Sequence, residues 1–234
     1  MLAKILTFKV NKGGIGKTFL TVQTGSGLAT AGKKTLIITS DSQNNVLNYT
    51  FPFEEKPVFK KGLKHFVKTG DGDLIRLREN LYYIPLEDNK FSSSFIKELP
   101  EFIKKISSDY DFILIDSIPT MKLDSIFVKC SDKVIIPYFC DPVTLEGVLN
   151  VIDEVGANKI HAIVPNLYRN TETQKKFYNN LKTILKDTRI LFPEPIKESS
   201  AVESLLAKGK TIWESEQKDI RDVQDIFINI IGTI

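Results

Sequence analysis

The sequence predicts an α/β fold in which a doubly wound, mostly parallel sheet carries helices on both faces. Short apolar segments alternate along the chain with longer segments whose apolar residues recur at the helical period. Several short segments, such as FILID at 112–116, are apolar at nearly every position, which is typical of strands buried on both sides. The 234 residues, 42% of them hydrophobic and 26% charged, can form one substantial core, so we expect a single domain over residues 1–234.

The expected strands follow one another through most of the chain. They cover residues 5–10, 35–39, 81–85, 112–116, 134–138 and 160–165. A helix is expected over 18–31, because the helical period stops at Gly32. The region 42–80 is the least regular, with two prolines and a Gly-Asp-Gly turn at 70–72. We predict that it is an insertion packed on the edge of the sheet and not a second domain.

Two amphipathic segments have alternative interpretations. Residues 60–68 (KKGLKHFVK) could form a basic helix for a membrane or nucleic acid, but inward packing of Leu63, Phe66 and Val67 with solvated lysines is favoured. The segment 219–231 places its apolar residues on one face. Most of the charges beside that face are acidic, which favours docking on the protein's own core over binding to a membrane.

The net charge of +3 conceals an uneven distribution. Residues 1–40 hold six lysines and no acid, and residues 159–189 hold seven bases and two acids. Two cysteines, Cys130 and Cys140, are too few for a disulfide framework and lack a zinc-site spacing, so we expect buried thiols. No apolar run approaches the ~20 residues that span a membrane, and the N-terminus does not resemble a signal peptide. We expect a cytoplasmic protein.

A glycine-rich loop follows the first expected strand. Residues 11–18 (NKGGIGKT) match the phosphate-loop pattern G-x-x-x-x-G-K-[ST], except that Asn11 replaces the first glycine. Glycines let backbone N–H groups surround a phosphate, and the helix N-terminus adds partial positive charge. Lys17 can reach the β- and γ-phosphates, and the Thr18 hydroxyl can bind Mg²⁺. The expected nucleotide-binding residues of this loop are Gly13, Gly14, Ile15, Gly16, Lys17, Thr18 and Phe19.

A second lysine in the loop, Lys12, produces the pattern K-G-G-x-G-K-T. With it the sequence resembles the ParA/MinD family of deviant Walker A P-loop ATPases, and most of all the small ParA/Soj-type partition proteins. The resemblance implies a P-loop NTPase fold, ATP and Mg²⁺ as ligands, and Mg²⁺-dependent hydrolysis of ATP to ADP and phosphate. It also implies a homodimer in which Lys12 reaches the partner subunit's phosphates, so that Lys12 and Lys17 both serve catalysis.

Two further stretches match the family at catalytic positions. Residues 39–45 (TSDSQNN) resemble D-x-D-P-Q-G-N, with Thr39 in place of the first Asp. The resemblance implies that Asp41 orients or activates the attacking water; the alternative is a turn or helix-cap residue. The strand at 112–116 ends on Asp116, at the edge where ligands bind in open α/β sheets. The resemblance implies that Asp116 holds Mg²⁺ through water.

The resemblance also implies residues that contact the adenine base, and two positions differ from the family pattern. Asn166 matches a position that contacts adenine in relatives, and Pro193 is a candidate to flank the base. Phe19 replaces the second hydroxyl residue that usually follows G-K-T, which removes an α-phosphate contact, and Thr39 removes a carboxylate. We therefore expect nucleotide binding and slow hydrolysis with altered affinity or rate.

Exposed bases are candidates for DNA binding. ParA-type proteins bind DNA without sequence preference as ATP-bound dimers, through bases that contact the phosphate backbone. For each candidate, the alternative to a DNA contact is an ordinary surface charge that is solvated by water. The candidates are Lys175, Lys176, Arg189, Lys208, Lys210 and Lys218.

The resemblance thus implies an ATP-dependent partition ATPase for plasmid or chromosome segregation, associated with the nucleoid. Its expected partners are a second copy of the chain, non-specific DNA and a ParB-like, DNA-bound protein that stimulates hydrolysis, with no membrane partner. The main alternative is a ParA-like ATPase that positions a protein or membrane-associated cargo without binding DNA. A small-molecule ligase similar to dethiobiotin synthetase is the third interpretation, but such an enzyme has no need of Lys12.

Overall fold

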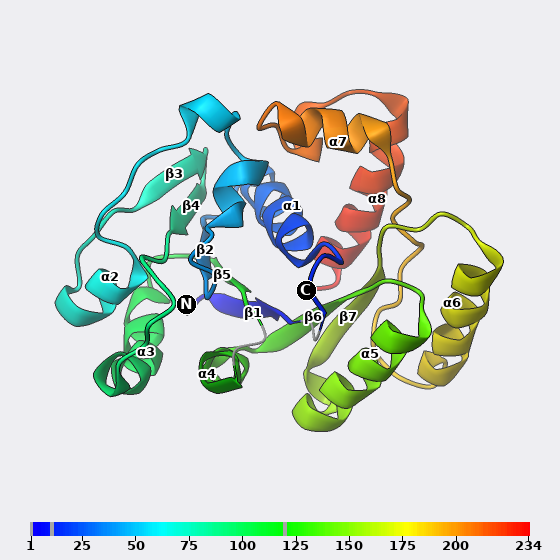
Figure 1. Cartoon of the computed structure of the whole chain (residues 1–234), viewed down its shortest axis with the longest axis horizontal. Helices are drawn as coiled ribbons and strands as arrows, with labels where there is room; N and C mark the ends of the chain where they lie inside the picture. The colour runs from blue at the N-terminus through cyan, green and yellow to red at the C-terminus, as the bar shows by residue number, and fades with distance from the viewer. Residues whose placement is uncertain (1, 10–11, 119–120) are drawn as a thin grey trace.

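A seven-stranded sheet lies at the centre of the computed structural model, which describes residues 2–9, 12–118 and 121–234. The strands are ordered β3-β4-β2-β5-β1-β6-β7 (Figure 1). All neighbouring pairs are parallel except β3 and β4, which are antiparallel. The predicted doubly wound, mostly parallel sheet is confirmed. Its strands are β1 (Lys4–Phe8), β2 (Thr35–Thr39), β3 (Ile75–Arg78), β4 (Leu81–Ile84), β5 (Phe112–Asp116), β6 (Lys133–Tyr138) and β7 (Ile160–Pro165).

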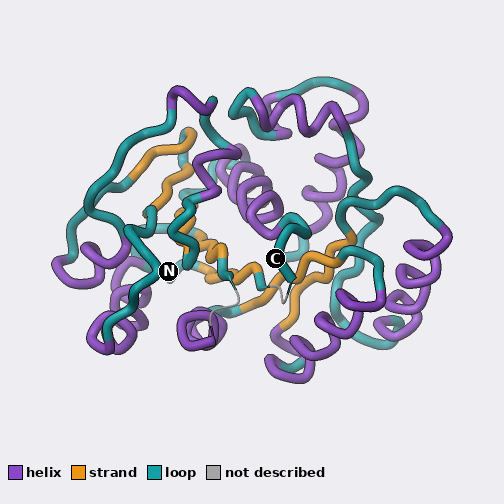
Figure 2. The backbone as a smooth tube through the Cα atoms, in the orientation of Figure 1, coloured by secondary structure: helices purple, strands orange, loops and turns teal. Residues whose placement is uncertain are grey.

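Helices cover both faces of this sheet (Figure 2). One face is covered by α1 (Lys17–Thr30), α7 (Ser200–Ala207) and α8 (Lys218–Gly232). The other is covered by α2 (Leu63–Thr69), α3 (Ser93–Ile106), α4 (Met121–Cys130), α5 (Pro142–Val155) and α6 (Glu172–Leu185). Short 3₁₀ helices complete the connections: η1 (Asn45–Tyr49), η2 (Phe53–Glu55), η3 (Ala157–Lys159) and η4 (Ile212–Glu214).

The two helical layers explain why the central strands are apolar throughout. In β5, Leu114 faces the layer with α1, whereas Ile113 and Ile115 face the layer with α3 and α4, and all three are fully buried. Successive side chains of a strand point to opposite faces, so a strand between two layers needs apolar residues at every position. The central strands end together at one edge, where β5 finishes on Asp116 and β2 on Thr39.

Both amphipathic segments pack on the core. On α2, Leu63 is fully buried, and Phe66 and Val67 pack against the same cluster. On α8, Phe227 and Ile230 are buried against the layer that contains α1. In each case the core-packing interpretation is confirmed. Across the described ranges, no helix is both long enough and apolar enough to cross a bilayer.

Two details differ from the predictions. The edge strand β3 (IRLR) was not predicted, because its alternation of apolar and basic residues lacks the continuous apolar character of the buried strands. Cys140 is buried as expected, and burial raises its pKa to about 12. Cys130, expected to be buried, is only partly covered, although burial still raises its pKa.

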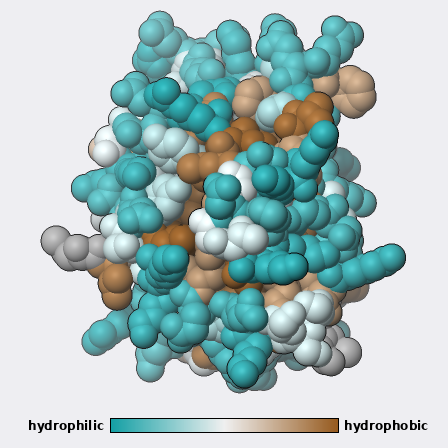
Figure 3. Space-filling model, turned by 90° about the vertical axis from the view of Figure 1, so that its left-hand side faces the viewer, coloured by the Kyte–Doolittle hydropathy of each residue, from teal (hydrophilic) through white to brown (hydrophobic). Residues whose placement is uncertain are grey.

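The irregular region after β2 ends in the edge strand β3, on the left of Figure 1, whereas its η1 packs against α1 and α7. Figure 3 views the molecule from this side and shows brown, apolar areas between hydrophilic side chains. Phe53 and Val58 are among the most exposed large apolar residues, at 82% and 90%. The Lys56 ammonium lies 4.3 Å from the centre of the Phe53 ring.

Candidate nucleotide-binding site

The glycine-rich loop connects β1 to α1 at the carboxyl edge of the sheet. Gly14 and Gly16 have φ angles of 79° and 92°, which lie in the left-handed region that favours glycine. A Cβ on Gly16 would also overlap the side-chain amide of Asn166. Gly16 is the N-cap of α1 and supplies no side-chain cap, so the first N–H groups of the helix are available to an anion.

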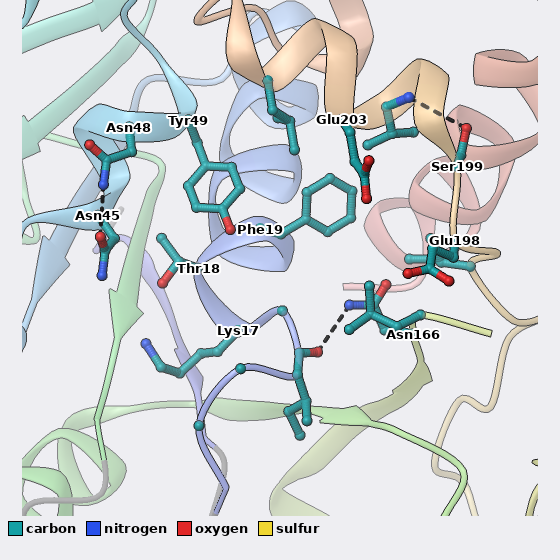
Figure 4. Close-up of a pocket in the computed structure, with 18 of the residues that line it drawn as sticks. Lys17, Thr18, Phe19, Asn45, Asn48, Tyr49, Asn166, Glu198, Ser199 and Glu203 are labelled. Atoms are coloured by element: carbon teal, nitrogen blue, oxygen red, sulfur yellow. Dashed lines mark hydrogen bonds between the residues drawn. The ribbon is translucent and has the colours of Figure 1, made fainter. Parts of the chain in front are cut away.

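A cavity of about 800 Å³ opens beside this loop. Its walls come from the loop with the start of α1, the segment that continues into η1, Ile118 after β5, the residues after β7, and α7 with the segment that leads into it. Figure 4 shows Lys17 and Thr18 at one end of the cavity, Asn166 and Glu198 at the other, and Tyr49 and Glu203 above. The cavity therefore lies at the strand ends, where open α/β sheets bind ligands.

Lys17 and Asp116 form a buried ion pair at the bottom of the cavity. Their side chains are 9% and 1% exposed, and the ammonium contacts Oδ1 of Asp116. The Thr18 hydroxyl donates to Oδ2 at 3.0 Å, and the Thr21 hydroxyl donates to Oδ1 at 3.4 Å. Lys17 can exchange this carboxylate for phosphate oxygens, because both are anionic acceptors within reach of one flexible side chain.

The same group of oxygens suits Mg²⁺. The ion prefers hard oxygen ligands and usually keeps several waters, binding one or two carboxylates together with substrate phosphates. The Thr18 hydroxyl and the Asp116 carboxylate supply such oxygens next to the loop. Within the described part of the chain, no group of three or more His, Cys, Asp or Glu residues could hold a metal alone. The donor set therefore fits an ion that is bound together with a nucleotide.

The uncharged side chain of Thr39 links the end of β2 to the end of β5 through hydrogen bonds. Its hydroxyl donates to the Asp116 carbonyl at 3.1 Å and accepts the N–H of Asp41 at 3.0 Å. The Asp41 carboxylate, which lines the cavity, accepts the Gln43 N–H at 2.9 Å and the Asn45 amide at 3.4 Å. These contacts fit the interpretation of Asp41 as a turn residue. Its position at the cavity wall also permits the predicted catalytic role, in which it orients the attacking water.

Lys12 lies at the rim of the cavity. Its side chain is 45% exposed, and its ammonium is 3.2 Å from Oδ2 of Asp141. Asp141 caps the N-terminus of α5 by accepting the Thr144 N–H at 2.6 Å. Burial opposes ionisation of Asp141, but the hydrogen bonds from Thr144 and Lys12 outweigh it, and the pKa of Asp141 lies below its ordinary value.

Asn166 reaches the cavity from the end of β7. It is 2% exposed, and its amide donates to the Ile15 carbonyl at 3.0 Å, so its NH₂ group already holds the loop (Figure 4). Pro193 is buried and is not among the residues that line the cavity, so its contact with the base stays a prediction. The Ile196 N–H bonds to the Pro165 carbonyl at 2.9 Å, and this contact brings residues 196–199 to the cavity wall instead.

Phe19 lies in the first turn of α1, lines the cavity and packs its ring into the core. The ring is 6% exposed, with its centre 6.5 Å from that of Tyr49 and 5.8 Å from that of Phe227. Tyr49 and Glu203, which also line the cavity, were not predicted because their segments carry no recognisable motif. Burial, together with the charge of Asp116, raises the pKa of Tyr49. Thr21 was also missed, although its spacing of four from Lys17 places both on one helix face.

The candidate DNA contacts fall in two separate stretches of the chain. Lys175 and Lys176 lie on α6 with Arg189 beyond it, whereas the remaining candidates lie between α7 and the first turn of α8. Lys175 pairs with Glu172 at 2.7 Å and is the least exposed. The other candidates are exposed, namely Lys176, Arg189, Lys208, Lys210 and Lys218.

The glycine loop, its lysine and the aspartate at the end of the adjacent strand define a P-loop nucleotide-binding protein. A family model described as an AAA domain matches residues 3–167, which is more than half of the chain. The chain belongs to the ParA/MinD family of P-loop ATPases.

Known proteins extend this similarity beyond the loop. The chain is 28% identical over 169 residues to the sporulation initiation inhibitor protein Soj of Bacillus subtilis (strain 168), an alignment that covers 66% of this chain and 65% of Soj. The chain therefore spans just under two thirds of that relative's length.

Two solved structures share the fold. A putative plasmid partition protein of Borrelia burgdorferi B31 bound to AMPPNP superposes with a TM-score of 0.75 and 22% identity, covering 100% of this chain and 98% of that one. A complex of ATP with a single-residue variant of Cyanothece McdA superposes with a TM-score of 0.78 and 17% identity, covering 99% and 97%.

Proposed function

We propose that the chain is an ATP-dependent partition ATPase that acts in plasmid or chromosome segregation. In this cycle ATP binding produces a homodimer with nucleotide between the subunits, and the dimer binds DNA without sequence preference. A ParB-like, DNA-bound partner then stimulates slow hydrolysis and release. The observation that carries the proposal is the contrast between two lysines of one loop. Lys17 is buried at the chain's own site, whereas Lys12 is exposed at the rim and can reach outward.

Hydrolysis would use the residues around the buried pair. Lys17 would leave Asp116 for the phosphates, where its charge offsets the charge that develops in the transition state. Thr18 and Asp116 would hold Mg²⁺, which supplies further positive charge to the phosphate oxygens. Asp41 would orient the attacking water from the cavity wall.

Exposed bases support the DNA step. Lys176, Lys208, Lys210 and Lys218 have exposed side chains that could contact phosphates. A gel shift on non-specific duplex DNA should show retention with ATP, and little with ADP or without nucleotide. Retention should fall steeply with salt, at a log–log slope of roughly −0.9 per phosphate neutralised. Retention that is independent of nucleotide would contradict the switch.

A pair of variants tests which bases matter. Lys208→Ala with Lys210→Ala removes two exposed bases and should weaken DNA binding and lower the salt slope. Lys175→Ala is the matched control, because Glu172 already neutralises that lysine, so its loss should change binding less. A larger effect of Lys175→Ala than of the double change would place the DNA face on α6 and not after α7.

A cargo-positioning ATPase that ignores DNA is the second candidate. It is favoured by the ion pairs of the basic stretch 159–189, where Glu198 neutralises Arg169 and Glu172 neutralises Lys175. These pairs leave less free positive charge than the sequence suggests. ATP-dependent dimerisation without DNA retention would support this candidate. The first proposal would then be wrong about DNA binding, while its nucleotide-dependent dimerisation would stand.

A further inference from the structure

A second buried lysine–carboxylate pair lies directly after β1, the strand that leads into the phosphate loop. Lys9, at the end of β1, is 4% exposed, and its ammonium pairs with Asp124 of α4, which is 5% exposed. Glu154 of α5 lies 3.4 Å from the same ammonium, but its side chain is 53% exposed. The principal partner of Lys9 is therefore Asp124, and the pair connects the strand before the loop to a helix that follows β5 (Figure 1).

Asp124 also holds the residue that follows Asp116. The Ser117 hydroxyl donates to Oδ1 of Asp124 at 2.7 Å, while the Ser117 N–H donates to the Phe8 carbonyl at 3.3 Å. Ser117 is itself 1% exposed. One carboxylate thus connects the end of β1, through Lys9, to the end of β5, through Ser117.

Stability alone gives a weak reason for such a pair. Both charges lose hydration when they are buried, and replacing a buried ion pair with neutral side chains of similar volume is often neutral or stabilising. The position of the pair is more informative. Asp116 and Ser117 are neighbours, and each has its own lysine-linked carboxylate contact: Asp116 is paired with Lys17, and Ser117 reaches Lys9 through Asp124.

The two pairs respond differently when a nucleotide enters the cavity. Lys17 faces the cavity, so its ammonium would exchange Asp116 for phosphate and leave that carboxylate without its cation. Lys9 does not line the cavity, so a phosphate bound there would not compete for it. The second pair would therefore persist when the first one is broken.

We propose that the Lys9–Asp124 pair positions Asp116 for Mg²⁺ once a nucleotide has drawn Lys17 away. The pair acts through Ser117, which it holds next to Asp116, and both of its members are positioning residues. This inference rests on the proposed nucleotide-binding function. Partners that orient a metal-binding carboxylate commonly change metal affinity by roughly 10- to 100-fold when they are lost.

The test is a Mg²⁺ titration of the binding of a fluorescent ATP analogue to the full chain. The Lys9→Met/Asp124→Asn double variant removes both charges, keeps similar volumes and leaves no unpaired buried ion. We expect binding without Mg²⁺ to be unchanged, and the Mg²⁺ concentration that gives half of the effect to rise roughly tenfold. The Lys64→Met/Asp88→Asn variant removes an ion pair that does not line the cavity and serves as the control, with an unchanged Mg²⁺ response.

A smaller change covers the case in which the double variant does not fold. Ser117→Ala leaves the ion pair in place and removes only the hydroxyl bond to Asp124, so its Mg²⁺ response should shift in the same direction by less. A folded double variant with the wild-type response would overturn the inference, and so would a wild-type response of Ser117→Ala if the double variant is unfolded. A wild-type chain that binds no nucleotide would overturn the proposed function as well.

Discussion

The two lysines of the phosphate loop lie in opposite surroundings. Lys17 is 9% exposed and pairs with an aspartate that is 1% exposed, whereas Lys12 is 45% exposed and pairs with one that is 19% exposed. Burial strengthens the first interaction and commits Lys17 to ligands inside the cavity. Exposure to water weakens the second, so Lys12 can leave Asp141 for another anion at low cost. Five residues of sequence thus separate a buried lysine that faces its own chain's cavity from an exposed lysine at the rim of that cavity.

The largest expected effect is on the buried pair. Lys17→Ala should weaken ATP binding by about 100-fold or more, because a charge-assisted contact with the phosphates is lost at a site shielded from water. Titration with a fluorescent ATP analogue measures the change, and thermal unfolding separates it from loss of fold. Lys33→Ala, which removes an exposed lysine outside the cavity, is the control and should bind normally. Retained binding in Lys17→Ala would refute the phosphate-loop assignment.

Asp41 tests whether the cavity beside Lys17 performs catalysis. Asp41→Ala should lower kcat by roughly 100-fold or more while ATP affinity changes little, since loss of a positioned base commonly costs that much. Asp41→Asn is the informative companion, because its amide oxygen can still accept the Gln43 N–H that shapes the turn. An equal loss in both variants supports the catalytic role. Full activity in Asp41→Asn would mean that Asp41 only shapes the turn and has no catalytic role.

The difference between the two lysines shows what a sequence can and cannot predict. The strands and the loop were predicted because their signals are local: apolar runs, helical period and glycines at fixed spacing. The partners of the lysines lie about 100 residues or more away, at Asp116 and Asp141. Only the order of the strands brings these positions together, and nothing in the local pattern encodes it.

The same reason explains which contacts around the cavity the sequence does not reveal. The position of Pro193 in the chain suggests a contact with the base, but the backbone contact between Ile196 and Pro165 brings residues 196–199 to the cavity wall. The buried pair of Lys9 and Asp124 joins elements that are more than 100 residues apart, so a lysine inside an apolar strand gave no sign of its partner. Edge strand β3 was missed for a different reason, since a strand that is partly open to solvent needs no continuous apolar run.

Lys12 provides the next test of the comparison. Lys12→Ala should reduce ATP-dependent dimerisation by about tenfold or more, because it removes the cation that the proposed function places against the partner's phosphates. ATP binding to the single chain should change by only a few fold, in contrast to Lys17→Ala. Sedimentation with ATP and with ADP measures the dimer, and nucleotide titration measures the binding. If Lys12→Ala instead abolished ATP binding, both lysines would serve the same subunit and the comparison would fail.

The smallest expected effect concerns the carboxylate that holds Lys12. Asp141→Asn keeps the cap on α5, because Asn is as good an N-cap as Asp, and removes only the charge. An exposed ion pair contributes about 0.2–1 kcal/mol, so releasing Lys12 should strengthen ATP-dependent dimerisation by roughly 1.4- to fivefold. The effect should vanish in a Lys12→Ala background.

The pH dependence of this effect has a defined sign. The pKa of Asp141 is held below its ordinary value, so the contribution of its charge is complete at neutral pH and is lost only as the pH falls through the lowered pKa. The difference between wild type and Asp141→Asn should therefore stay constant from about pH 6 to 8, well above the ordinary carboxyl range. Sedimentation across that range measures it. A difference that changes within it would mean that another titrating group, and not Asp141, controls Lys12.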